Sequence, residues 1–588
     1  MKLSINRNIV WSDIFVNRLA QLGVHNACIS PGSRNTSLTL AFNSNRLIKI
    51  YQIVDERSSA FFALGLAKKT NSPVAVVTTS GTAVAELYPA IIEAYYSRVP
   101  LIICTADRPY HLLDRGANQT INQINIYKNH IRYFKDAGLP DINKLSFIKQ
   151  VAEEAIHFST VDNRGPVHIN LPFEKPFEPK SYTDSIELKK IENIFTHSSF
   201  ETAPPSQSSV NFESLSKKLL KKEKGLIIVG YNNYSDAFSG KVIKLAEKLG
   251  YPVYADGASS LRLRSRSKNI FIDNLTSFIR HRDFQKHFDP KIIIQFGAAP
   301  TSNVLLEFFK NSKAEKILVN DFGDRKDPSL TAKTIIRFEP AQFCSMLADS
   351  IKEKGNRDSC WKIDMQVMNS FSGDLKSRII DKAKFPFEGK IVSEIIDAIP
   401  ARSNLFVSNS MPIRDTDFFV SANRKKIKLF CNRGASGIDG INSTAIGIAA
   451  RSKEKTFLII GDLAFYHDLN GLLNSVKFKI PLTIILINNS GGGIFESLPI
   501  SRYRAGFTEN FSTPLNLDFE KIVKAYGGKY FKINSWKNLK EKVILSSGNR
   551  HLSVLEIRTD AKKSKLQRNK YWNAVSKRVV RFINETKS

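Results

Sequence analysis

Short apolar runs rich in β-branched residues recur along this chain, and segments long enough to form a helix separate them. Strands that are buried on both faces of a parallel sheet have this composition. The runs are Val74–Thr78, Leu101–Thr105, Val167–Asn170, Leu226–Val229, Ile292–Phe296, Ile317–Val319, Phe457–Ile460, Leu482–Ile487 and Leu552–Ile557. Their alternation with helical segments predicts βαβ units, and therefore an α/β fold with parallel sheets covered by helices.

Two polar stretches rich in breaker residues divide the chain. One is Ala-Pro-Pro-Ser-Gln-Ser-Ser at 203–209, and the other is Glu-Lys-Gly-Asn-Arg-Asp at 353–358. Loops and linkers have this composition, and 588 residues are several times the usual size of one hydrophobic core. We therefore expect three α/β domains, 1–185, 186–355 and 356–588, with no short internal repeat.

Composition narrows the class of protein. With 42% hydrophobic and 24% charged residues the chain is typical of globular proteins, and no apolar run approaches the roughly 20 residues that cross a bilayer. The first ten residues contain no continuous apolar stretch of the kind found in signal peptides, so we expect a cytoplasmic protein. The five cysteines are widely spread without a Cys-x-x-Cys pair, which predicts buried free thiols.

The net charge of +31 allows three kinds of anionic partner: small molecules, nucleic acid or a membrane surface. Lys and Arg are scattered and no nucleic-acid-binding signature accompanies them, which favours a generally basic surface. The densest basic cluster, residues 562–581, is predicted to be a solvated helix. We expect no nucleic-acid partner and at most peripheral contact with a membrane.

The strongest local signal is a pair of polar residues that each follow a predicted strand. Gly461-Asp462-Leu463 follows the strand 456–460, and Asn488-Asn489 follows the strand 482–487. The spacing leaves room for one helix between two parallel strands, so both side chains emerge at the carboxyl edge of one sheet, where ligands bind. Carboxylate, amide and backbone oxygens suit Mg²⁺, and Gly491 to Gly493 allow close approach of the backbone. Each residue taken alone is also an ordinary turn residue.

This Gly-Asp and Asn-Asn pair resembles the metal and diphosphate motif of thiamine-diphosphate enzymes, with Leu463 where many of them have glycine. The resemblance implies thiamine diphosphate and Mg²⁺, with Mn²⁺ as an alternative, held by Asp462, Asn489 and the carbonyl of Gly491. It also implies a catalytic glutamate that hydrogen-bonds the pyrimidine ring of the cofactor. Glu56, in Val54-Asp55-Glu56-Arg57, matches it, although an acidic residue at a helix start is usually only a favourable dipole contact.

Further segments make the resemblance closer. They are Ser30-Pro31-Gly32-Ser33-Arg34, Thr79-Ser80-Gly81-Thr82-Ala83, Thr105-Ala106-Asp107-Arg108-Pro109, Gly116-Ala117-Asn118-Gln119, Asn432-Arg433-Gly434-Ala435-Ser436-Gly437-Ile438-Asp439-Gly440 and Gly493-Ile494-Phe495. Together they are similar to the 2-succinyl-5-enolpyruvyl-6-hydroxy-3-cyclohexene-1-carboxylate synthase family of menaquinone biosynthesis. The similarity covers the first and third domains nearly throughout and is weak in the middle domain.

The family resemblance implies a reaction in which 2-oxoglutarate loses CO₂ and the remaining fragment joins isochorismate. Both substrates carry several negative charges, so a partly dry site has to supply arginines and N–H donors. The implied substrate-binding residues are Ser33, Arg34, Arg108, Asn118, Gln119, Ser410, Arg414, Arg433, Ile494, Phe495 and Leu498, and Ile438 is implied to press under the cofactor. The family often has a lysine where this chain has Asn303.

The resemblance also implies a homodimer, possibly a tetramer, in which Glu56 of one subunit and Asp462 of the other bind one cofactor.

Two other functions stay open. An acetolactate-synthase-like or 2-oxo-acid-decarboxylase-like enzyme would keep the cofactor and use pyruvate. An inactive relative would bind nucleic acid or membrane through its basic surface. The ten histidines have no metal-ligand spacing.

Overall fold

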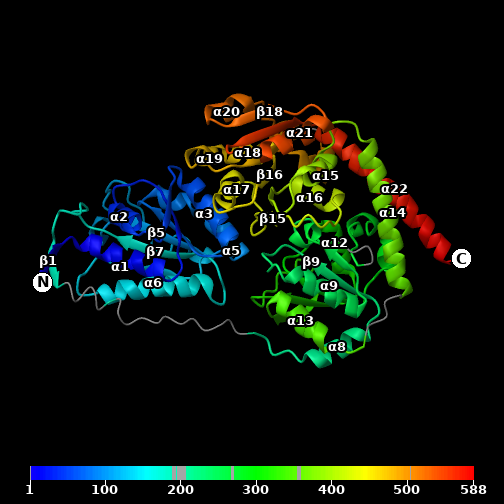
Figure 1. Ribbon diagram of the computed structural model, residues 1–588, viewed down its shortest axis with the longest axis horizontal. Coiled ribbons are helices and arrows are strands. Elements are labelled where there is room, and N and C mark those ends of the chain that lie inside the picture. Colours follow the sequence, from blue (N-terminus) through cyan, green and yellow to red (C-terminus); the bar gives the residue numbers. More distant parts are fainter. Residues whose placement is uncertain are drawn as a thin grey trace.

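The computed structural model describes residues 2–187, 194, 207–265, 270–353, 359–503 and 505–587. The described chain forms three parallel β-sheets, each covered by its own helices (Figure 1). The α/β class predicted from the apolar runs is confirmed. Residues 203–206 and 354–358, which belong to the two predicted linkers, lie outside the described residues.

The first sheet has the strand order β3-β2-β4-β5-β7-β6. A short antiparallel pair, β1 and β8, lies beside it and extends to Glu187. The elements are β1 (Lys2–Ile5), α1 (Arg7–Gln21), β2 (Asn26–Ile29), α2 (Thr36–Ser44), β3 (Lys49–Gln52), α3 (Glu56–Thr70), β4 (Val74–Thr78), α4 (Thr82–Glu86), α5 (Tyr88–Ser97), β5 (Leu101–Asp107), η1 (Tyr110–Leu112), η2 (Lys128–His130), β6 (Phe134–Asp136), α6 (Leu145–Thr160), β7 (Val167–Pro172) and β8 (Asp184–Glu187).

The middle sheet has the order β10-β9-β11-β12-β13, and all its strand pairs are parallel. Its elements are α8 (Phe212–Leu220), β9 (Gly225–Val229), α9 (Phe238–Leu249), β10 (Val253–Ala255), η3 (Ser260–Leu263), α10 (Leu275–Phe278), α11 (Arg282–His287), β11 (Ile292–Phe296), α12 (Asn303–Asn311), β12 (Glu315–Asn320), β13 (Ala332–Arg337) and α13 (Pro340–Ser350).

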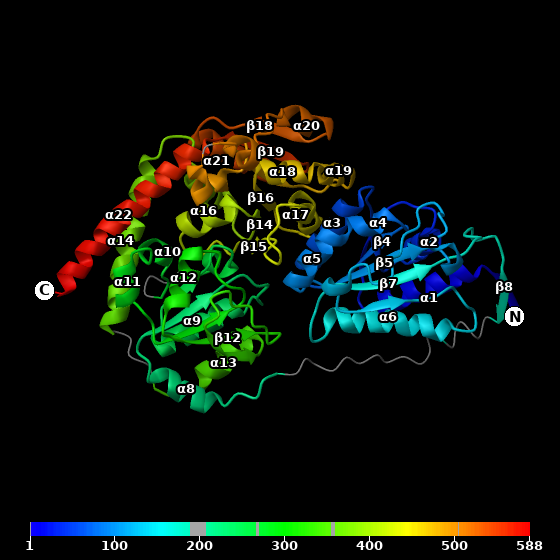
Figure 2. The ribbon, with the colours of Figure 1, turned by 180° about the vertical axis from the view of Figure 1, so that it is seen from behind.

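The third sheet has the order β15-β14-β16-β17-β19-β18. Its elements are α14 (Cys360–Lys382), α15 (Glu388–Ala398), β14 (Asn404–Val407), α16 (Met411–Phe419), β15 (Lys428–Phe430), α17 (Ile441–Ala450), β16 (Thr456–Gly461), α18 (Asp462–His467), η4 (Leu469–Gly471), α19 (Leu472–Lys477), β17 (Thr483–Asn488), η5 (Gly493–Ser497), η6 (Pro499–Arg502), η7 (Thr508–Ser512), α20 (Phe519–Ala525), β18 (Lys529–Lys532), α21 (Trp536–Ser547), β19 (Ser553–Arg558) and α22 (Ala561–Lys587). Helices α14 and α22 run side by side in both views (Figures 1 and 2).

The first and third sheets share one topology. The strands of each sheet can be counted along the chain, starting from β2 in the first sheet and from β14 in the third. Counted in this way, the strands of both sheets lie in the order 2-1-3-4-6-5. No short sequence repeat indicates that the two sheets share a topology. A parallel strand that is covered by helices on both faces mainly has to be apolar, so very different sequences can form the same topology.

The nine predicted strands are confirmed, with ends shifted by at most two residues. They are the most buried segments of the fold: every residue of β4, β5, β9, β11 and β17 is buried. Burial on both faces explains why these strands read as continuous apolar runs rather than as alternating ones.

Helices α3 and α17 join the first and third domains by close backbone contact. A Cβ on Gly65 would lie 2.1 Å from the carbonyl oxygen of Thr444, and one on Gly447 would lie 2.1 Å from that of Phe62. Beside them, the buried pair Lys68 and Glu93 ties α3 and α5 to the following segment of the third domain, where Glu93 accepts the backbone N–H groups of residues 434 and 435. The two domains therefore meet as one packed unit.

Two expectations from composition need correction. Four cysteines are buried free thiols, but Cys360 is exposed, because it is the first residue of α14 on the surface. The basic segment 562–581 is helical, as predicted, but it is not solvated all round. Arg568, Tyr571 and Val575 of α22 are buried, because this helix packs against α14 and α10.

In the part of the chain that the structure describes, no helix combines the length and the apolar character that spanning a membrane requires.

His168 in β7 is a fully buried histidine in the first sheet. Its Nε2 lies 2.7 Å from the Thr105 hydroxyl, and burial lowers its pKa to about 3. Between pH 6.5 and 3, His168 binds a proton in the unfolded chain but not in the folded protein. The contribution of His168 to stability is therefore complete above pH 6.5 and is lost as the pH falls. We expect this group alone to lower the free energy of unfolding of the wild-type protein by about 2 kcal/mol between pH 8 and pH 5.

The replacement His168→Gln should lower stability at pH 8 and reduce this acid-induced loss. Thermal unfolding midpoints of both proteins at pH 8 and pH 5 measure the difference. His467→Gln, which replaces an exposed histidine, is the matched control and should keep the wild-type pH dependence. Equal pH dependence of His168→Gln and wild type would contradict the assignment.

Candidate functional site

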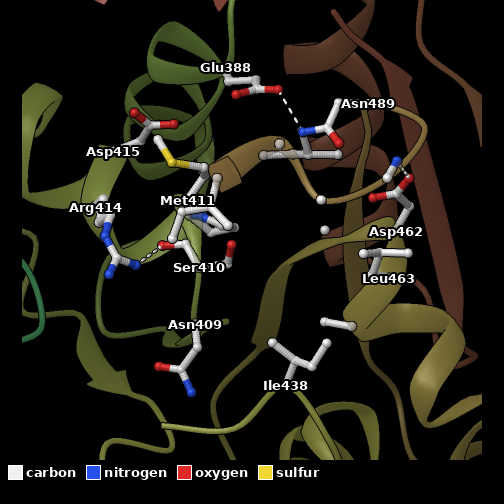
Figure 3. A pocket seen from close by; sticks show the side chains of 18 of the residues that line it. Glu388, Asn409, Ser410, Met411, Arg414, Asp415, Ile438, Asp462, Leu463 and Asn489 are labelled. Atoms are coloured by element: carbon white, nitrogen blue, oxygen red, sulfur yellow. Dashed lines mark hydrogen bonds between the residues drawn. The ribbon is translucent and has the colours of Figure 1, made fainter. Parts of the chain in front are cut away.

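A cavity of about 330 Å³ opens at the carboxyl edge of the third sheet. Within the described part of the chain, every residue that lines it belongs to the stretch from Glu388 to Phe495. Figure 3 shows Asp462 and Asn489 on one side of this pocket, Ser410 and Arg414 on the opposite side, and Ile438 between them. The third domain alone therefore builds this cavity.

The predicted metal ligands emerge from neighbouring strands, as their spacing indicated. Strands β16 and β17 are parallel, with Gly461 opposite Ile487, so Asp462 and Asn489 follow at the same edge. One carboxylate oxygen of Asp462 accepts the N–H of Gly491 at 2.7 Å. That bond ties the glycine loop to the strand end and brings the three predicted ligands into one cavity wall.

These residues fit a divalent cation with a diphosphate. The Oδ1 of Asn489 is buried and, among the described residues, has no hydrogen-bond partner, which is costly unless a cation or donor occupies the space in front of it. Burial raises the pKa of Asp462 to about 6, a cost that a bound cation would reverse. Gly491 has φ +132°, and a Cβ there would lie 1.9 Å from the carbonyl oxygen of Ser512, so the loop is built for close backbone approach.

No group of three or more His, Cys, Asp or Glu side chains that could hold a metal gathers among the described residues. The candidate set at this edge instead combines one carboxylate, one amide and one backbone carbonyl. Such mixed oxygen donors suit Mg²⁺ that keeps phosphate or water oxygens as its remaining ligands.

Two arginines face the same cavity from the other side. Arg414 in α16 donates to the carbonyl of Ser410 at 2.7 Å, and Arg433 donates to Asn409 at 3.2 Å. Burial lowers the pKa of Arg414, and the charge of Arg433 lowers it further. Two cations that repel one another in a half-buried pocket favour an anionic ligand between them.

The apolar wall is formed by Ile438, Ile494 and Phe495, as the resemblance implied, and also by Met411. Leu498 does not line the cavity in the single chain; it follows η5 and its side chain is exposed. Asn303 is the exposed first residue of α12 in the middle domain, and it does not line the cavity either.

The other five predicted substrate residues gather in the first domain, at the carboxyl edge of its own sheet. Arg34 is buried and donates to the carbonyl of Phe173, and Arg108 donates twice to the carbonyl of Asn118. Burial lowers the pKa of Arg34 to about 10, and the charge of Arg108 acts in the same direction. The remaining two, Ser33 and Gln119, are exposed.

Glu56 is the first residue of α3, and it does not line the cavity of its own chain. Burial raises its pKa, and the nearby carboxylates of Asp55 and Glu86 raise it further. The start of α3 contacts the far end of α18, where Arg57 donates to the carbonyl of His467. The residue after Glu56 therefore contacts the last residue of α18, whereas Asp462 is the first residue of that helix.

Sequence reasoning missed several residues around the cavity. Glu388 and Asp415 line it and are both paired with Arg568 of α22. Burial raises the pKa of Asp415 despite the opposing effect of Arg568. These residues carry no motif of their own, since only the packing of α15, α16 and α22 brings them together. The available signal was weak, because Glu388 is an acidic residue at the start of a helix, where it is usually only a favourable dipole contact.

Four non-glycine residues with left-handed backbone lie in or beside the predicted site: Gln119, Ser410, Ser436 and Ser490, with φ of 53°, 70°, 64° and 58°. Such conformations cost free energy and persist where the surrounding structure fixes them, often at functional sites. Ser410 is also the residue before α16, and it lines the cavity together with Met411 and Pro412 at the start of that helix.

Comparison with known proteins identifies the class. Residues 10–126, 197–407 and 425–557 match the family models for the N-terminal thiamine pyrophosphate-binding domain, the middle domain and the C-terminal thiamine pyrophosphate-binding domain of thiamine pyrophosphate enzymes. The crystal structure of benzoylformate decarboxylase from Polynucleobacter necessarius has the same fold, with a TM-score of 0.70 at 16% identity over 94% of this chain and 98% of that one. Fold and cavity define a thiamine-diphosphate-dependent enzyme.

Relatives with higher identity narrow the class to one family. The chain is 38% identical to the 2-succinyl-5-enolpyruvyl-6-hydroxy-3-cyclohexene-1-carboxylate synthase of Bacillus cytotoxicus, covering 95% of each chain, and 37% identical to that of Geobacillus kaustophilus, covering 98% and 99%. The synthase of Trichodesmium erythraeum is 37% identical, covering 94% and 96%. The chain belongs to the 2-succinyl-5-enolpyruvyl-6-hydroxy-3-cyclohexene-1-carboxylate synthase family.

Proposed function

We propose that this enzyme decarboxylates 2-oxoglutarate and joins the remaining four-carbon fragment to isochorismate, giving 2-succinyl-5-enolpyruvyl-6-hydroxy-3-cyclohexene-1-carboxylate and CO₂ in menaquinone biosynthesis. The observation that carries the proposal is the cavity of the third domain, which is lined both by the predicted metal ligands and by Arg414 and Arg433. Membership of the synthase family over nearly the whole chain supports it.

Asp462, Asn489 and the carbonyl of Gly491 would hold Mg²⁺ or Mn²⁺ and, through it, the diphosphate of the cofactor. Ile438 would support the thiazolium ring, and Glu56 would hold a proton at the pyrimidine nitrogen. Thiamine diphosphate, when bound, supplies an electron sink that lets the carboxyl group of the 2-oxo acid leave as CO₂. Arg414, Arg433 and the hydroxyl of Ser410 would bind substrate carboxylates on the third-domain side.

The enzyme would work as a homodimer at least. Within the described chain the cavity has no wall from the first domain, although Glu56 and five of the predicted substrate-binding residues belong to that domain. A second copy that brings its first domain, 1–185, over the third domain, 356–588, would complete the site. It would place Arg34, Arg108, Ser33, Asn118 and Gln119 opposite the arginines of the cavity, and Leu498 beside the substrate.

The rival activity is decarboxylation of pyruvate or another monocarboxylate, as in acetolactate-synthase-like enzymes. Two arginines in the cavity and two more in the first domain favour substrates with several carboxylates, because an unpaired buried cation is costly. An inactive relative that binds nucleic acid is disfavoured because the chain has Glu56 and because the proposed metal ligands Asp462, Asn489 and Gly491 line one cavity.

The test is an assay of the purified protein with thiamine diphosphate and Mg²⁺, following CO₂ release and loss of isochorismate. We expect both only when 2-oxoglutarate and isochorismate are present, with pyruvate as the control 2-oxo acid. CO₂ from pyruvate alone would leave the cofactor assignment standing and overturn the substrates.

We also propose that the enzyme resides in the cytoplasm, in keeping with five cysteines that are all free, and that any membrane contact is peripheral. Fractionation of cells, with liposome flotation of the purified protein, tests both statements. Most of the protein should stay in the soluble fraction.

A further inference from the structure

A buried chain of polar side chains links the C-terminal helix to the predicted metal ligand Asn489. Glu388, the first residue of α15, accepts the Nδ2 amide group of Asn489 at 2.9 Å and the hydroxyl of Thr559 at 3.0 Å on the same oxygen. Its other oxygen accepts from Arg568 of α22 at 2.6 Å. Glu388 and Arg568 are each only 2% exposed, so water does not compete for these bonds.

The chemistry of this contact decides which atom of Asn489 faces the cavity. An ionised carboxylate can only accept hydrogen bonds, so the side of the amide that meets Glu388 has to be the NH₂ group. The oxygen then points the other way, and it is this buried Oδ1 that has no partner among the described residues. A hard cation binds the amide oxygen and not the nitrogen.

Arg568 fixes Glu388 in turn. Its guanidinium contacts Glu388 and both carboxylate oxygens of Asp415 in α16, so three elements meet at one buried cation. One arginine thus donates to two carboxylates, and both oxygens of Glu388 are used as acceptors. Neither acidic residue is a predicted ligand of the cofactor or of the substrates.

We propose that Glu388, held by Arg568, is a positioning residue that orients the side-chain amide of Asn489 so that its oxygen faces the metal site. The inference rests on the proposed function, because it assumes that a divalent cation binds at Asp462 and Asn489. It assigns to the C-terminal helix α22 a part in metal binding that its basic sequence does not suggest.

The experiment measures Mn²⁺ binding directly, by the decrease of the free Mn²⁺ EPR signal in the presence of thiamine diphosphate. Glu388→Gln is isosteric but presents an NH₂ group of its own, so one contact, to Asn489 or to Arg568, becomes a clash of donors. Partners of metal ligands contribute about 10- to 100-fold to metal affinity, and we expect a loss of that size. The Mg²⁺ concentration for half-maximal activity should rise equally, with kcat at saturating Mg²⁺ changed much less.

A second replacement separates orientation from damage to the fold. In Asn489→Asp the new carboxylate faces Glu388, so two negative charges meet and Mn²⁺ binding should weaken, although an acidic ligand has been added. When Glu388→Gln and Asn489→Asp are combined, the introduced amide can donate to the introduced carboxylate, and the affinity should return toward the wild-type value. Only an orienting contact between the two side chains predicts this recovery.

Asp327→Asn is the matched control for losing a buried ion pair. Asp327 pairs with Lys316 at 2.7 Å in the middle domain, so its replacement should lower stability and leave Mn²⁺ affinity unchanged. Unchanged affinity in Glu388→Gln, or tighter binding in Asn489→Asp alone, would overturn the positioning role while leaving the proposed function intact. Absence of Mn²⁺ and cofactor binding by the wild-type protein would overturn both.

Discussion

Replacing Glu56 by Gln should reduce kcat by about 10²- to 10⁴-fold, the range that proton transfer by a positioned side chain contributes. Gln keeps the size and one hydrogen bond but has no exchangeable acidic proton to share with a ring nitrogen. Burial and two neighbouring carboxylates raise the pKa of Glu56, which favours the protonated form that the proposed role requires. Steady-state kinetics, with thiamine-diphosphate binding followed by calorimetry, measures the effect.

The matched control is Asp55→Asn. Asp55 is the N-cap of α3 and accepts the N–H of Ser58 at 2.9 Å; Asn caps helices equally well, so this variant removes a neighbouring negative charge without losing the cap. We expect activity close to wild type. Full activity of Glu56→Gln, with the cofactor still bound, would exclude Glu56 as the proton-holding residue.

Replacing Asp462 by Ala should weaken binding of Mg²⁺ with thiamine diphosphate by at least about 100-fold. Loss of a residue that only hydrogen-bonds to a metal ligand lowers metal affinity by up to about 100-fold, and loss of a ligand itself should lower it at least as much. The carboxylate has two functions: it is the one acidic oxygen donor of the candidate set, and it accepts the N–H of Gly491. Without it, the divalent cation loses its charged ligand and the glycine loop loses its anchor. Calorimetric titration of the metal and cofactor together measures the loss.

Asp468→Asn is the control, because Asp468 is buried just past the other end of α18 and accepts from Ser443 rather than facing the cavity. Its replacement should lower stability without a comparable loss of affinity. Equal affinity of Asp462→Ala and wild type would remove Asp462 from the metal site.

The two variants together test whether the site is shared between subunits. In a hybrid dimer of one Glu56→Gln chain and one Asp462→Ala chain, a shared arrangement leaves one of the two sites with both wild-type residues. Activity should therefore reappear when the two inactive proteins are co-expressed and isolated through different tags. If each chain used its own Glu56 and Asp462, every site would carry one replacement and the hybrid would stay inactive.

The sequence determined the fold class and the positions of the strands, because doubly buried strands have to be apolar throughout. It also determined that Asp462 and Asn489 meet, since both follow neighbouring parallel strands whose carboxyl ends share an edge. The spacing predicted one helix between these strands, but the connection consists of α18, η4 and α19. Arg414 and Arg433 were expected from the resemblance of their motifs to those of the family, and both line the cavity.

Only the tertiary structure decided the contacts that join distant parts of the chain. Glu388, Asn489 and Arg568 lie far apart in the sequence. No local pattern predicts that a helix expected to be solvated would bury an arginine against Glu388, the partner of the predicted metal ligand Asn489. The identical topology of the first and third sheets was hidden for the same reason. The local sequence pattern indicates which residues are buried and where turns occur, whereas the partner of a buried polar group depends on how whole helices and sheets pack.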